Sequence, residues 1–341
     1  MGIALKELIT GKEIDIKSLS GKIICIDAPM ILYQFLTTIR QADGNYFTDQ
    51  EGRVTSHLIG INSRIGKLLQ YGLKLIFVFD GKSPELKYKE QQKRKDAKKE
   101  AEAKYKIAME TKDFSAMRKY AARNVRVTTE IISETKELVE AFGIPVIDAP
   151  SEAEAQSSYM VKKGDAYAVA TQDADTLMFG CNKVIRNLSL VGKHKKNNKL
   201  DYQTYKPEII EISEVLNHLG IDQEQFILLS ILIGTDFNPG GIKGIGPKNA
   251  LKLVKENKTK DKLIEELKEK IEFDFEEVYQ TIKNVPVTNN YKLEWKKPDP
   301  KKVYQILVEK HNFSEERVNK VLEQLNEQAE SKKQKSLGEF I

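Results

Sequence analysis

The chain has 341 residues, 40% of them hydrophobic and 31% charged, which is enough apolar material for a sizeable core under an unusually ionic surface. Its 55 Lys and Arg against 50 Asp and Glu leave a formal net charge of +5, too small to indicate a polyanionic ligand. No uncharged apolar run approaches the roughly 18 residues of a membrane span, and Lys6 and Glu7 interrupt the N-terminus too early for a signal peptide. The two cysteines are isolated and suit a reducing compartment, so we expect a cytoplasmic protein that does not contact membranes.

Three short β-rich runs each lead into an aspartate. They are residues 22–26 before Asp27, residues 73–79 before Asp80, and residues 167–171 before Asp173 and Asp175. Apolar residues at consecutive positions need cover on both faces, which predicts an α/β fold with a central, mostly parallel sheet and helices on both faces. The carboxyl ends of parallel strands share one edge of a sheet, where such folds bind ligands. We therefore expect the aspartates to lie together at that edge.

Residues 82–130 have a helical composition and few aliphatic side chains, which predicts a helical insertion above the sheet. Residues 82–106 include ten basic and five acidic side chains, a net charge of +5 that equals that of the whole chain. Aromatic residues, among them Tyr88 and Tyr120, alternate with these charges. On the sequence alone, a solvated helix with i,i+4 ion pairs explains this segment equally well.

We predict a single domain over residues 1–328, interrupted by this insertion. Its predicted parts are an α/β core at 1–81 and 131–239, the insertion at 82–130, C-terminal helices at 240–328 and, after the domain, a flexible tail at 329–341. A further apolar run at 144–147 leads into a helix that begins near Ser151. The C-terminal part begins with a glycine-rich segment at 240–248, which leads into a helix at 248–256.

Seven acidic residues are candidates for a shared site, namely Asp27, Asp80, Glu152, Glu154, Asp173, Asp175 and Asp236. Each has an ordinary structural alternative. Ser151 and Glu154 have the spacing of a helix capping box, and Asp80 before Gly81 is typical of a turn. As a set they are more informative, because two carboxylates about 4 Å apart repel each other by about 4 kcal/mol at an effective dielectric constant of about 20.

Several ionised carboxylates at one edge require either protonation or divalent cations, and an all-oxygen ligand set favours Mg²⁺ or Mn²⁺. Such a site suits two-metal phosphodiester hydrolysis, in which one ion lowers the pKa of an attacking water and both stabilise charge on the reacting oxygens. The sequence does not support a serine hydrolase, an NTPase or a zinc hydrolase. The sequence has no Gly-x-Ser-x-Gly motif and no P-loop, and no metal-ligand spacing exists among the four histidines, His57, His194, His218 and His311.

Several segments, in this order, resemble the motifs of structure-specific 5′ nucleases, and most closely those of archaeal-type flap endonucleases. The segments are 27–28, 52–58, 77–82, 149–155, 170–175 and 234–246. The resemblance extends over the whole chain. It implies that the seven acids are metal ligands, some directly and some through water, of two Mg²⁺ ions for which Mn²⁺ can substitute.

The same resemblance implies roles for basic and aromatic residues. Lys87 and Arg94 stand seven apart, on one face of a helix, and correspond to the basic pair with which the family reaches the scissile phosphate from the base of an arch. Tyr33 matches an aromatic residue on which the family stacks a base beside the cut, although the sequence alone favours a core residue. The insertion corresponds to the arch, through which a free 5′ single strand passes.

The glycine-rich segment resembles the helix-two-turn-helix element of the family. Its exposed backbone N–H groups and the following helix N-terminus can grip a duplex phosphate without reading sequence. The residues expected to bind DNA there are Gly240, Gly241, Lys243, Gly244, Gly246 and Lys248. In the family a potassium ion often binds at this element. An ordinary glycine turn before a helix is the alternative.

The C-terminal residues Gln334, Leu337, Phe340 and Ile341 resemble the sliding-clamp-binding box Gln-x-x-aliphatic-x-x-aromatic-aromatic, with Ile341 in place of the second aromatic residue. The spacing i, i+3, i+4 places Leu337, Phe340 and Ile341 on one side of a helical turn. This resemblance implies a PCNA-type sliding clamp as a partner. A frayed terminus with three chance hydrophobic residues is the alternative.

The sequence thus predicts a monomeric, metal-dependent endonuclease that cuts branched DNA at the junction of a duplex and a 5′ flap, during replication and repair. A related 5′–3′ exonuclease or junction-resolving nuclease is the alternative among enzymes. A catalytically silent, clamp-associated DNA-binding protein is the second alternative. Such a protein would lack one of the carboxylates, whereas all seven are present.

Overall fold

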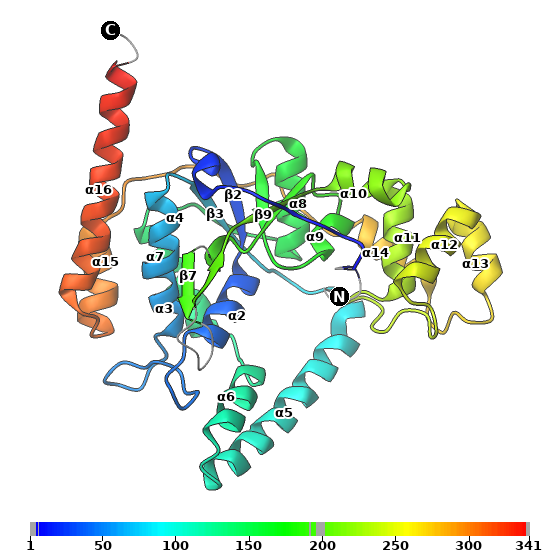
Figure 1. The fold of residues 1–341 in the computed structure, drawn as a ribbon, viewed down its shortest axis with the longest axis horizontal. Coiled ribbons are helices and arrows are strands. Elements are labelled where there is room, and N and C mark those ends of the chain that lie inside the picture. Colours follow the sequence, from blue (N-terminus) through cyan, green and yellow to red (C-terminus); the bar gives the residue numbers. More distant parts are fainter. Residues whose placement is uncertain (1–4, 6, 191, 196–201, 339–341) are drawn as a thin grey trace.

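A seven-stranded sheet lies at the centre of the computed structural model, which describes residues 5, 7–190, 192–195 and 202–338 (Figure 1). The spatial order of its strands is β1-β9-β6-β5-β2-β3-β4. Their bounds are β1 Lys12–Glu13, β2 Ile23–Asp27, β3 Lys74–Phe79, β4 Val146–Asp148, β5 Ala168–Ala170, β6 Lys183–Arg186 and β9 Glu208–Glu211. Neighbouring strands from β6 to β4 are parallel, and β9 is antiparallel to both β6 and β1. The predicted central, mostly parallel sheet is confirmed.

Alternate residues of the central strands point into two separate apolar cores. On β2, Ile24 and Ile26 pack into one core, whereas Cys25 packs into the other. The first core is covered by α2 (Ala28–Thr38), α3 (Ser56–Gly60), α4 (Gly66–Gln70), α7 (Thr129–Ala141), α15 (Pro300–Tyr304) and α16 (Glu315–Gly338). The second is covered by α8 (Ala153–Lys163), α9 (Asp175–Met178), α10 (Ile212–Leu219), α11 (Gln223–Ile233), α12 (Pro247–Asn257), α13 (Lys260–Leu267) and α14 (Phe275–Lys283). Burial on both faces explains the consecutive apolar residues of these strands.

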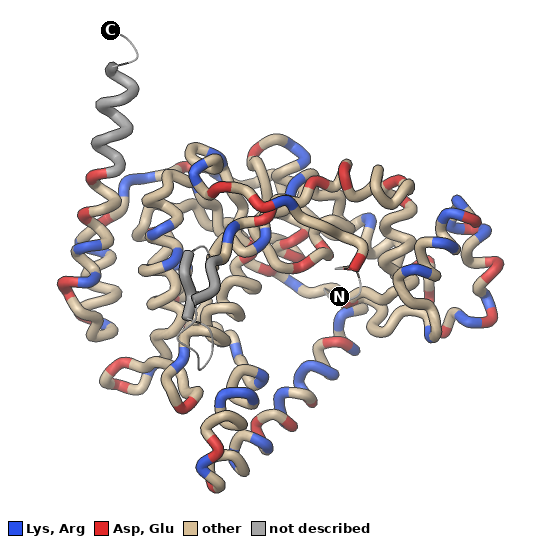
Figure 2. The backbone as a smooth tube through the Cα atoms, viewed as in Figure 1, with Lys and Arg blue, Asp and Glu red and all other residues tan. Residues whose placement is uncertain are grey.

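The predicted insertion consists of two helices, α5 (Tyr88–Glu110) and α6 (Phe114–Arg123), which project from the body as an arch (Figure 1). Lys and Arg residues occur along both helices (Figure 2). The far part of the arch is attached to the loop after α2, because the Tyr105 hydroxyl donates to Asn45 Oδ1 at 2.8 Å and Arg118 Nε donates to the Ala42 carbonyl at 2.5 Å. The arch therefore meets the body at both of its ends.

The glycine-rich segment connects α11 to α12. Gly240, Gly241 and Gly244 have φ angles of +94°, +59° and +81°, which other L-residues rarely adopt. A β-carbon at Gly241 would also lie 2.3 Å from the carbonyl oxygen of Leu232. The helix predicted at 248–256 is observed at Pro247–Asn257, with proline in the first turn, where its missing N–H is not needed.

Helix α16 continues through residue 328 to Gly338, whereas the sequence predicts a flexible tail from residue 329. Gln334 and Leu337 lie on this helical backbone, and their side chains are outside the described part of the structure. Phe340 and Ile341 lie outside the described residues altogether. Within the described ranges, no helix is both long enough and apolar enough to cross a bilayer.

Candidate active site

The predicted aspartates lie at the carboxyl ends of strands, and β2 pairs in parallel with both β3 and β5. Asp27 ends β2 and caps α2, its Oδ1 accepting the N–H of Met30 at 3.1 Å. Asp80 follows β3, and its Oδ1 accepts the N–H of Ala153, at the start of α8, at 2.8 Å. Thr171 follows β5 and donates its hydroxyl to Asp27 Oδ2 at 3.1 Å. The carboxyl ends of β2, β3 and β5 therefore meet at one edge, as predicted.

Glu152 and Glu154 lie at the start of α8. Glu152 is the N-cap residue of this helix, and its own side chain makes no capping hydrogen bond. The capping-box explanation of Ser151 and Glu154 is therefore wrong. Close packing fixes the start of α8 against β3, because a β-carbon at Gly81 would lie only 2.1 Å from the carbonyl oxygen of Ala149.

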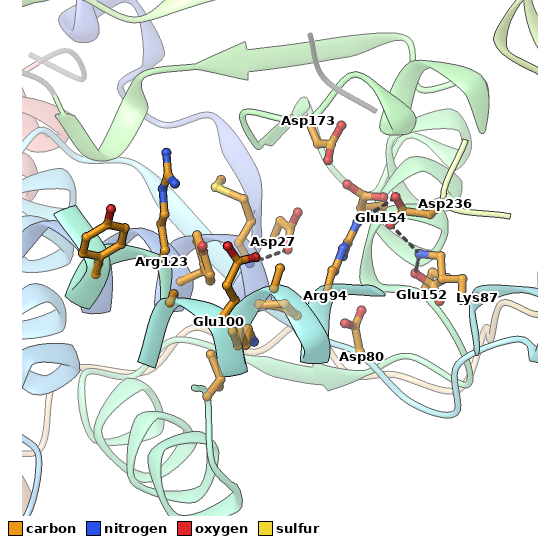
Figure 3. Close-up of a pocket in the computed structure, with 18 of the residues that line it drawn as sticks. Asp27, Asp80, Lys87, Arg94, Glu100, Arg123, Glu152, Glu154, Asp173 and Asp236 are labelled. Atoms are coloured by element: carbon orange, nitrogen blue, oxygen red, sulfur yellow. Dashed lines mark hydrogen bonds and ion pairs between the residues drawn. The ribbon is translucent and has the colours of Figure 1, made fainter. Parts of the chain in front are cut away.

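A cavity of about 740 Å³ lies between the sheet edge and the arch (Figure 3). Six of the seven predicted acids line it, namely Asp27, Asp80, Glu152, Glu154, Asp173 and Asp236. Lys87 and Arg94 from the arch base and Tyr33 from α2 line it as well. Asp175 does not line the cavity. It is 3% exposed and lies beside it, its N–H donating to Asp173 Oδ1 at 3.4 Å.

Lys87 and Arg94 form ion pairs with two of these acids (Figure 3). Lys87 Nζ is 2.5 Å from Glu152 Oε2 and 3.6 Å from Asp236 Oδ2, and Arg94 Nη2 is 2.7 Å from Asp236 Oδ1. Burial alone would lower the pKa of Lys87, but the carboxylates of Glu152, Glu154 and Asp236 raise it, so the side chain is an ammonium. Two positive charges therefore face the acid cluster from the arch base.

Burial and mutual repulsion raise the pKa of several carboxyl groups in the cavity. Burial, followed by the charge of Asp80, raises the pKa of Asp27 to about 7. Burial, followed by the charge of Glu152, raises the pKa of Asp80 to about 6. Burial and the charges of Asp173 and Asp175 hold the pKa of Glu154 well above its ordinary value. These groups therefore need cations nearby to be ionised together at neutral pH.

The donor chemistry of the cavity fits hard divalent cations. All the candidate ligands are carboxylates, and the buried Oδ1 of Asp175 has no hydrogen-bond partner. Among the described side chains, no three acidic, histidine or cysteine groups already converge as a complete ligand set. Glu152 and Asp236 are instead paired with Lys87 and Arg94. The assignment of the seven acids to two ions stays a prediction, which the donor types support.

Tyr33 is 45% exposed and lines the cavity, so its interpretation as a core residue is wrong. The arch contributes further cavity residues that the sequence did not single out for the site, namely Lys98, Glu100, Lys104, Tyr120 and Arg123. Lys104 Nζ lies 5.9 Å from the ring centroid of Tyr120. The alternation of basic and aromatic residues over the insertion is the sequence signal that could have identified them.

The glycine-rich segment does not line this cavity, but a short loop joins the two. Asp236 lies in this loop, four residues before Gly240. Lys243 and Lys248 are exposed beside the positive-φ glycines. The segment therefore presents an exposed surface of backbone and lysine next to the acid cluster, and its role in binding DNA stays a prediction.

Two of the histidines form a buried network away from the cavity. His57 Nε2 is 3.3 Å from Glu134 Oε2, and His311 Nε2 is 3.1 Å from Glu134 Oε1. The other ring nitrogen of His311 lies 2.9 Å from Asp49 Oδ2. The network joins the loop before α3 to α7 and to the segment after α15, which is a structural role.

Two protein families match this chain, and together they cover more than half of its residues. The XPG N-terminal domain family matches residues 1–101, and the XPG I-region family matches residues 143–236. The chain is 47% identical over 329 residues to the flap endonuclease 1 of Hyperthermus butylicus, covering 95% of this chain and 94% of that protein. It is 47% identical over 341 residues to the flap endonuclease 1 of Thermococcus onnurineus, covering 100% of this chain and 99% of that protein.

The chain is also similar to nucleases whose structures have been solved. The flap endonuclease-1 from Methanococcus jannaschii is 38% identical, with a TM-score of 0.75 over 97% of this chain and 100% of that chain. The catalytic core of Rad2 in complex with DNA substrate is 25% identical, with a TM-score of 0.70 over 95% of this chain and 100% of that chain. The similarity therefore includes the arch and the C-terminal helices as well as the sheet.

Proposed function

Because the chain belongs to the flap endonuclease family of nucleases, we propose that it cleaves branched DNA at the junction of a duplex and a 5′ single-stranded flap, in DNA replication and repair. The observation that carries the proposal is the cavity in which six carboxylates face Lys87 and Arg94 beneath the arch. Such a cavity combines groups that can hold cations with groups that can bind a phosphate. It suits hydrolysis of a phosphodiester bond.

Nucleases of this family depend on divalent metal ions, and Mg²⁺, with Mn²⁺ as a substitute, fits the oxygen donors of the cavity. The seven acids would hold two ions, some directly and some through water. When bound, the ions would lower the pKa of an attacking water and neutralise charge on the phosphate. The raised carboxyl pKa values and the unpartnered Asp175 oxygen support this assignment.

Lys87 and Arg94 would bind the scissile phosphate. Each lies within hydrogen-bonding distance of a carboxylate oxygen, and the same N–H groups can donate to a phosphate oxygen. The Arg94 side chain is 55% exposed and can turn toward a substrate, whereas Lys87 is 13% exposed and is held deeper. Tyr33, which lines the same cavity and is exposed, presents a ring on which a base beside the cut would stack.

The glycine-rich segment would hold the duplex. Gly240, Gly244 and Gly246 leave the backbone open to a phosphate, and Lys243 and Lys248 add positive charge beside it. Gly241 packs against the end of α11, and its N–H donates to the Asn238 carbonyl at 3.1 Å, so it would shape the turn. A potassium ion at this element would contribute further positive charge. Because these contacts are to phosphates, they select the shape of the DNA and not its sequence.

Recruitment to DNA would use a PCNA-type sliding clamp, bound by Gln334, Leu337, Phe340 and Ile341. The spacing of these residues supports this partner. We propose that the enzyme itself is monomeric and acts in the cytoplasm. Its two cysteines, Cys25 and Cys181, are both buried and unpaired.

A related 5′–3′ exonuclease or junction-resolving nuclease would use the same site on a different substrate, and a catalytically silent DNA-binding protein would not cut at all. The test compares an end-labelled 5′ flap with a nicked duplex and a four-way junction, each in Mg²⁺ and in EDTA. We expect one major product from the flap in Mg²⁺ and none in EDTA. Preferential shortening of the nicked strand or cutting of the four-way junction would favour the alternative nucleases, and binding without cleavage would refute the proposal.

A further inference from the structure

The ammonium group of Lys87 has an aromatic neighbour in addition to its two carboxylates. Lys87 Nζ lies 5.2 Å from the ring centroid of Phe237, within the range of a cation–π interaction. Phe237 is 4% exposed, so the contact is largely shielded from water. An ammonium has three N–H bonds, and its surroundings offer Glu152, Asp236 and one aromatic face.

Phe237 is held in place by the loop that also carries Asp236. Its N–H donates to Thr235 Oγ1 at 3.0 Å, and Asn238 Nδ2 donates to the Ile231 carbonyl at 2.8 Å. The ring packs edge-on against Phe179, with centroids 6.5 Å apart and an interplanar angle of 86°. The position of the ring is therefore fixed by groups other than Lys87, so the ring can serve as a rigid surface for the lysine.

We infer that Phe237 is a positioning residue for Lys87. The face of the Phe237 ring holds the Lys87 ammonium where it can meet the scissile phosphate. The inference rests on the proposed role of Lys87 in binding that phosphate. A lysine side chain is flexible, and carboxylates alone attract its charge without fixing its direction. A ring that faces the ammonium from another direction limits this freedom, which matters because misplacement of a catalytic group by about 1 Å can slow a reaction by about a hundredfold.

The competing explanation is that Phe237 only fills space beside Phe179. Fluorination of the ring separates the two explanations, because it weakens the negative potential of the aromatic face and changes the volume little. The experiment therefore places mono-, di- and trifluorophenylalanine at position 237 and measures single-turnover cleavage of a 5′ flap in Mg²⁺. Flap-DNA affinity and the melting temperature are measured on the same proteins.

We expect the single-turnover rate to fall step by step with each added fluorine, while DNA affinity and melting temperature stay at wild-type values. Phe237→Leu should be about three- to thirty-fold slower than wild type, which corresponds to about 0.7–2 kcal/mol at about 1.4 kcal/mol per tenfold. Phe237→Tyr keeps the aromatic face and should retain most of the rate. The matched control is the same fluorinated series at Phe179, which should leave the rate unchanged.

Lys87→Ala distinguishes failure of this inference from failure of the proposed function. If Lys87→Ala is slow but fluorination at position 237 has no effect, the positioning role is refuted and the role of Lys87 stands. If Lys87→Ala cleaves at the wild-type rate, the proposed function of Lys87 fails first. In the Lys87→Ala background, fluorination should have no further effect, and an undiminished graded response there would also overturn the inference.

Discussion

Arg94 Nη2 lies 2.7 Å from Asp236 Oδ1, although the two residues are 142 positions apart in the sequence. This ion pair joins the base of the arch to the loop between α11 and the glycine-rich segment. At its far part, the arch is held by the contact of Tyr105 with Asn45. The arch is thus attached to the body at two places. This double attachment holds the arch over the carboxylates and limits how a substrate can reach them.

The two basic residues at the arch base should affect the rate of the chemical step more than the affinity for DNA. Lys87→Ala and Arg94→Ala should each lower the single-turnover rate at saturating enzyme by about a hundredfold or more, because each removes a charge placed to stabilise the phosphate in the transition state. Lys89→Ala is the matched control, since Lys89 is exposed on the same helix and does not line the cavity. If the two variants lose only DNA affinity, with the saturating rate unchanged, the basic pair is a tether and has no catalytic role.

Tyr33 should contribute through its ring and not through its hydroxyl. Tyr33→Ala should weaken productive binding of a flap substrate by about tenfold or more, because stacking of a base on an aromatic side chain is worth about 1–3 kcal/mol. Tyr33→Phe should stay within a few-fold of the wild type. A fluorescent base analogue next to the cut would report stacking directly. Equal defects in the two variants would contradict the stacking role.

The sequence predicts those strands whose residues are buried at consecutive positions. Strands β2 and β3 consist almost entirely of apolar residues and end beside an aspartate, so their pattern is visible locally. Strands β6 and β9 each contain one apolar pair, Val184 with Ile185 and Ile209 with Ile210, between polar residues. Their strand conformation depends on pairing with each other across more than twenty positions. Local pattern cannot supply that information.

The site is predictable to the extent that the sheet determines it. Asp27, Asp80 and Asp173 follow strands, so topology alone brings them to one edge. The cavity residues Tyr120 and Arg123 are different, because their position depends on α6 folding back against the loop after α2. The contact of Phe237 with Lys87 likewise depends on how the arch base meets the loop after α11. The alternation of basic and aromatic residues indicates that the insertion takes part in the site, but the local sequence does not show which residues make these contacts between distant segments.

The buried histidine network predicts a dependence of stability on pH. Burial alone would raise the pKa of Glu134, but the close approach of His57 and of the Lys310 ammonium to its carboxylate lowers it from 4.5 to about 2. The folded protein therefore binds this proton more weakly than the unfolded chain does. The resulting stabilisation is present above pH 4.5 and is lost as the pH falls through about 2.

Glu134→Gln should accordingly lower the free energy of unfolding at pH 7 by about 1–2 kcal/mol, a range that allows for partial solvent screening. The difference from the wild type should shrink as the pH falls from 4.5 toward 2. Urea unfolding at pH 7, 4 and 3 measures this. Glu140→Gln, exposed on the same helix, is the control and should show no such trend. A difference of constant size at all three pH values would contradict the assignment of the shift to Glu134.

The C-terminal residues should matter only in the presence of a sliding clamp. Deletion of residues 334–341, or the double substitution Leu337→Ala and Phe340→Ala, should leave flap cleavage by the isolated enzyme unchanged. Stimulation by the cognate clamp should be lost, because a short segment that binds a partner raises the local concentration of enzyme on DNA without altering its active site. Full stimulation of the truncated enzyme would refute the clamp-binding role.

The most direct test of the carboxylate cavity combines cleavage and binding in one pair of variants. Asp80→Ala and Asp173→Ala should each reduce single-turnover cleavage of a 5′ flap in Mg²⁺ by about a thousandfold or more, because a ligand that supports the transition state is worth several kcal/mol. The affinity of both variants for the same flap DNA, titrated in parallel, should stay close to that of the wild type. Cleavage near the wild-type rate by either variant would contradict the assignment of these acids to the catalytic centre.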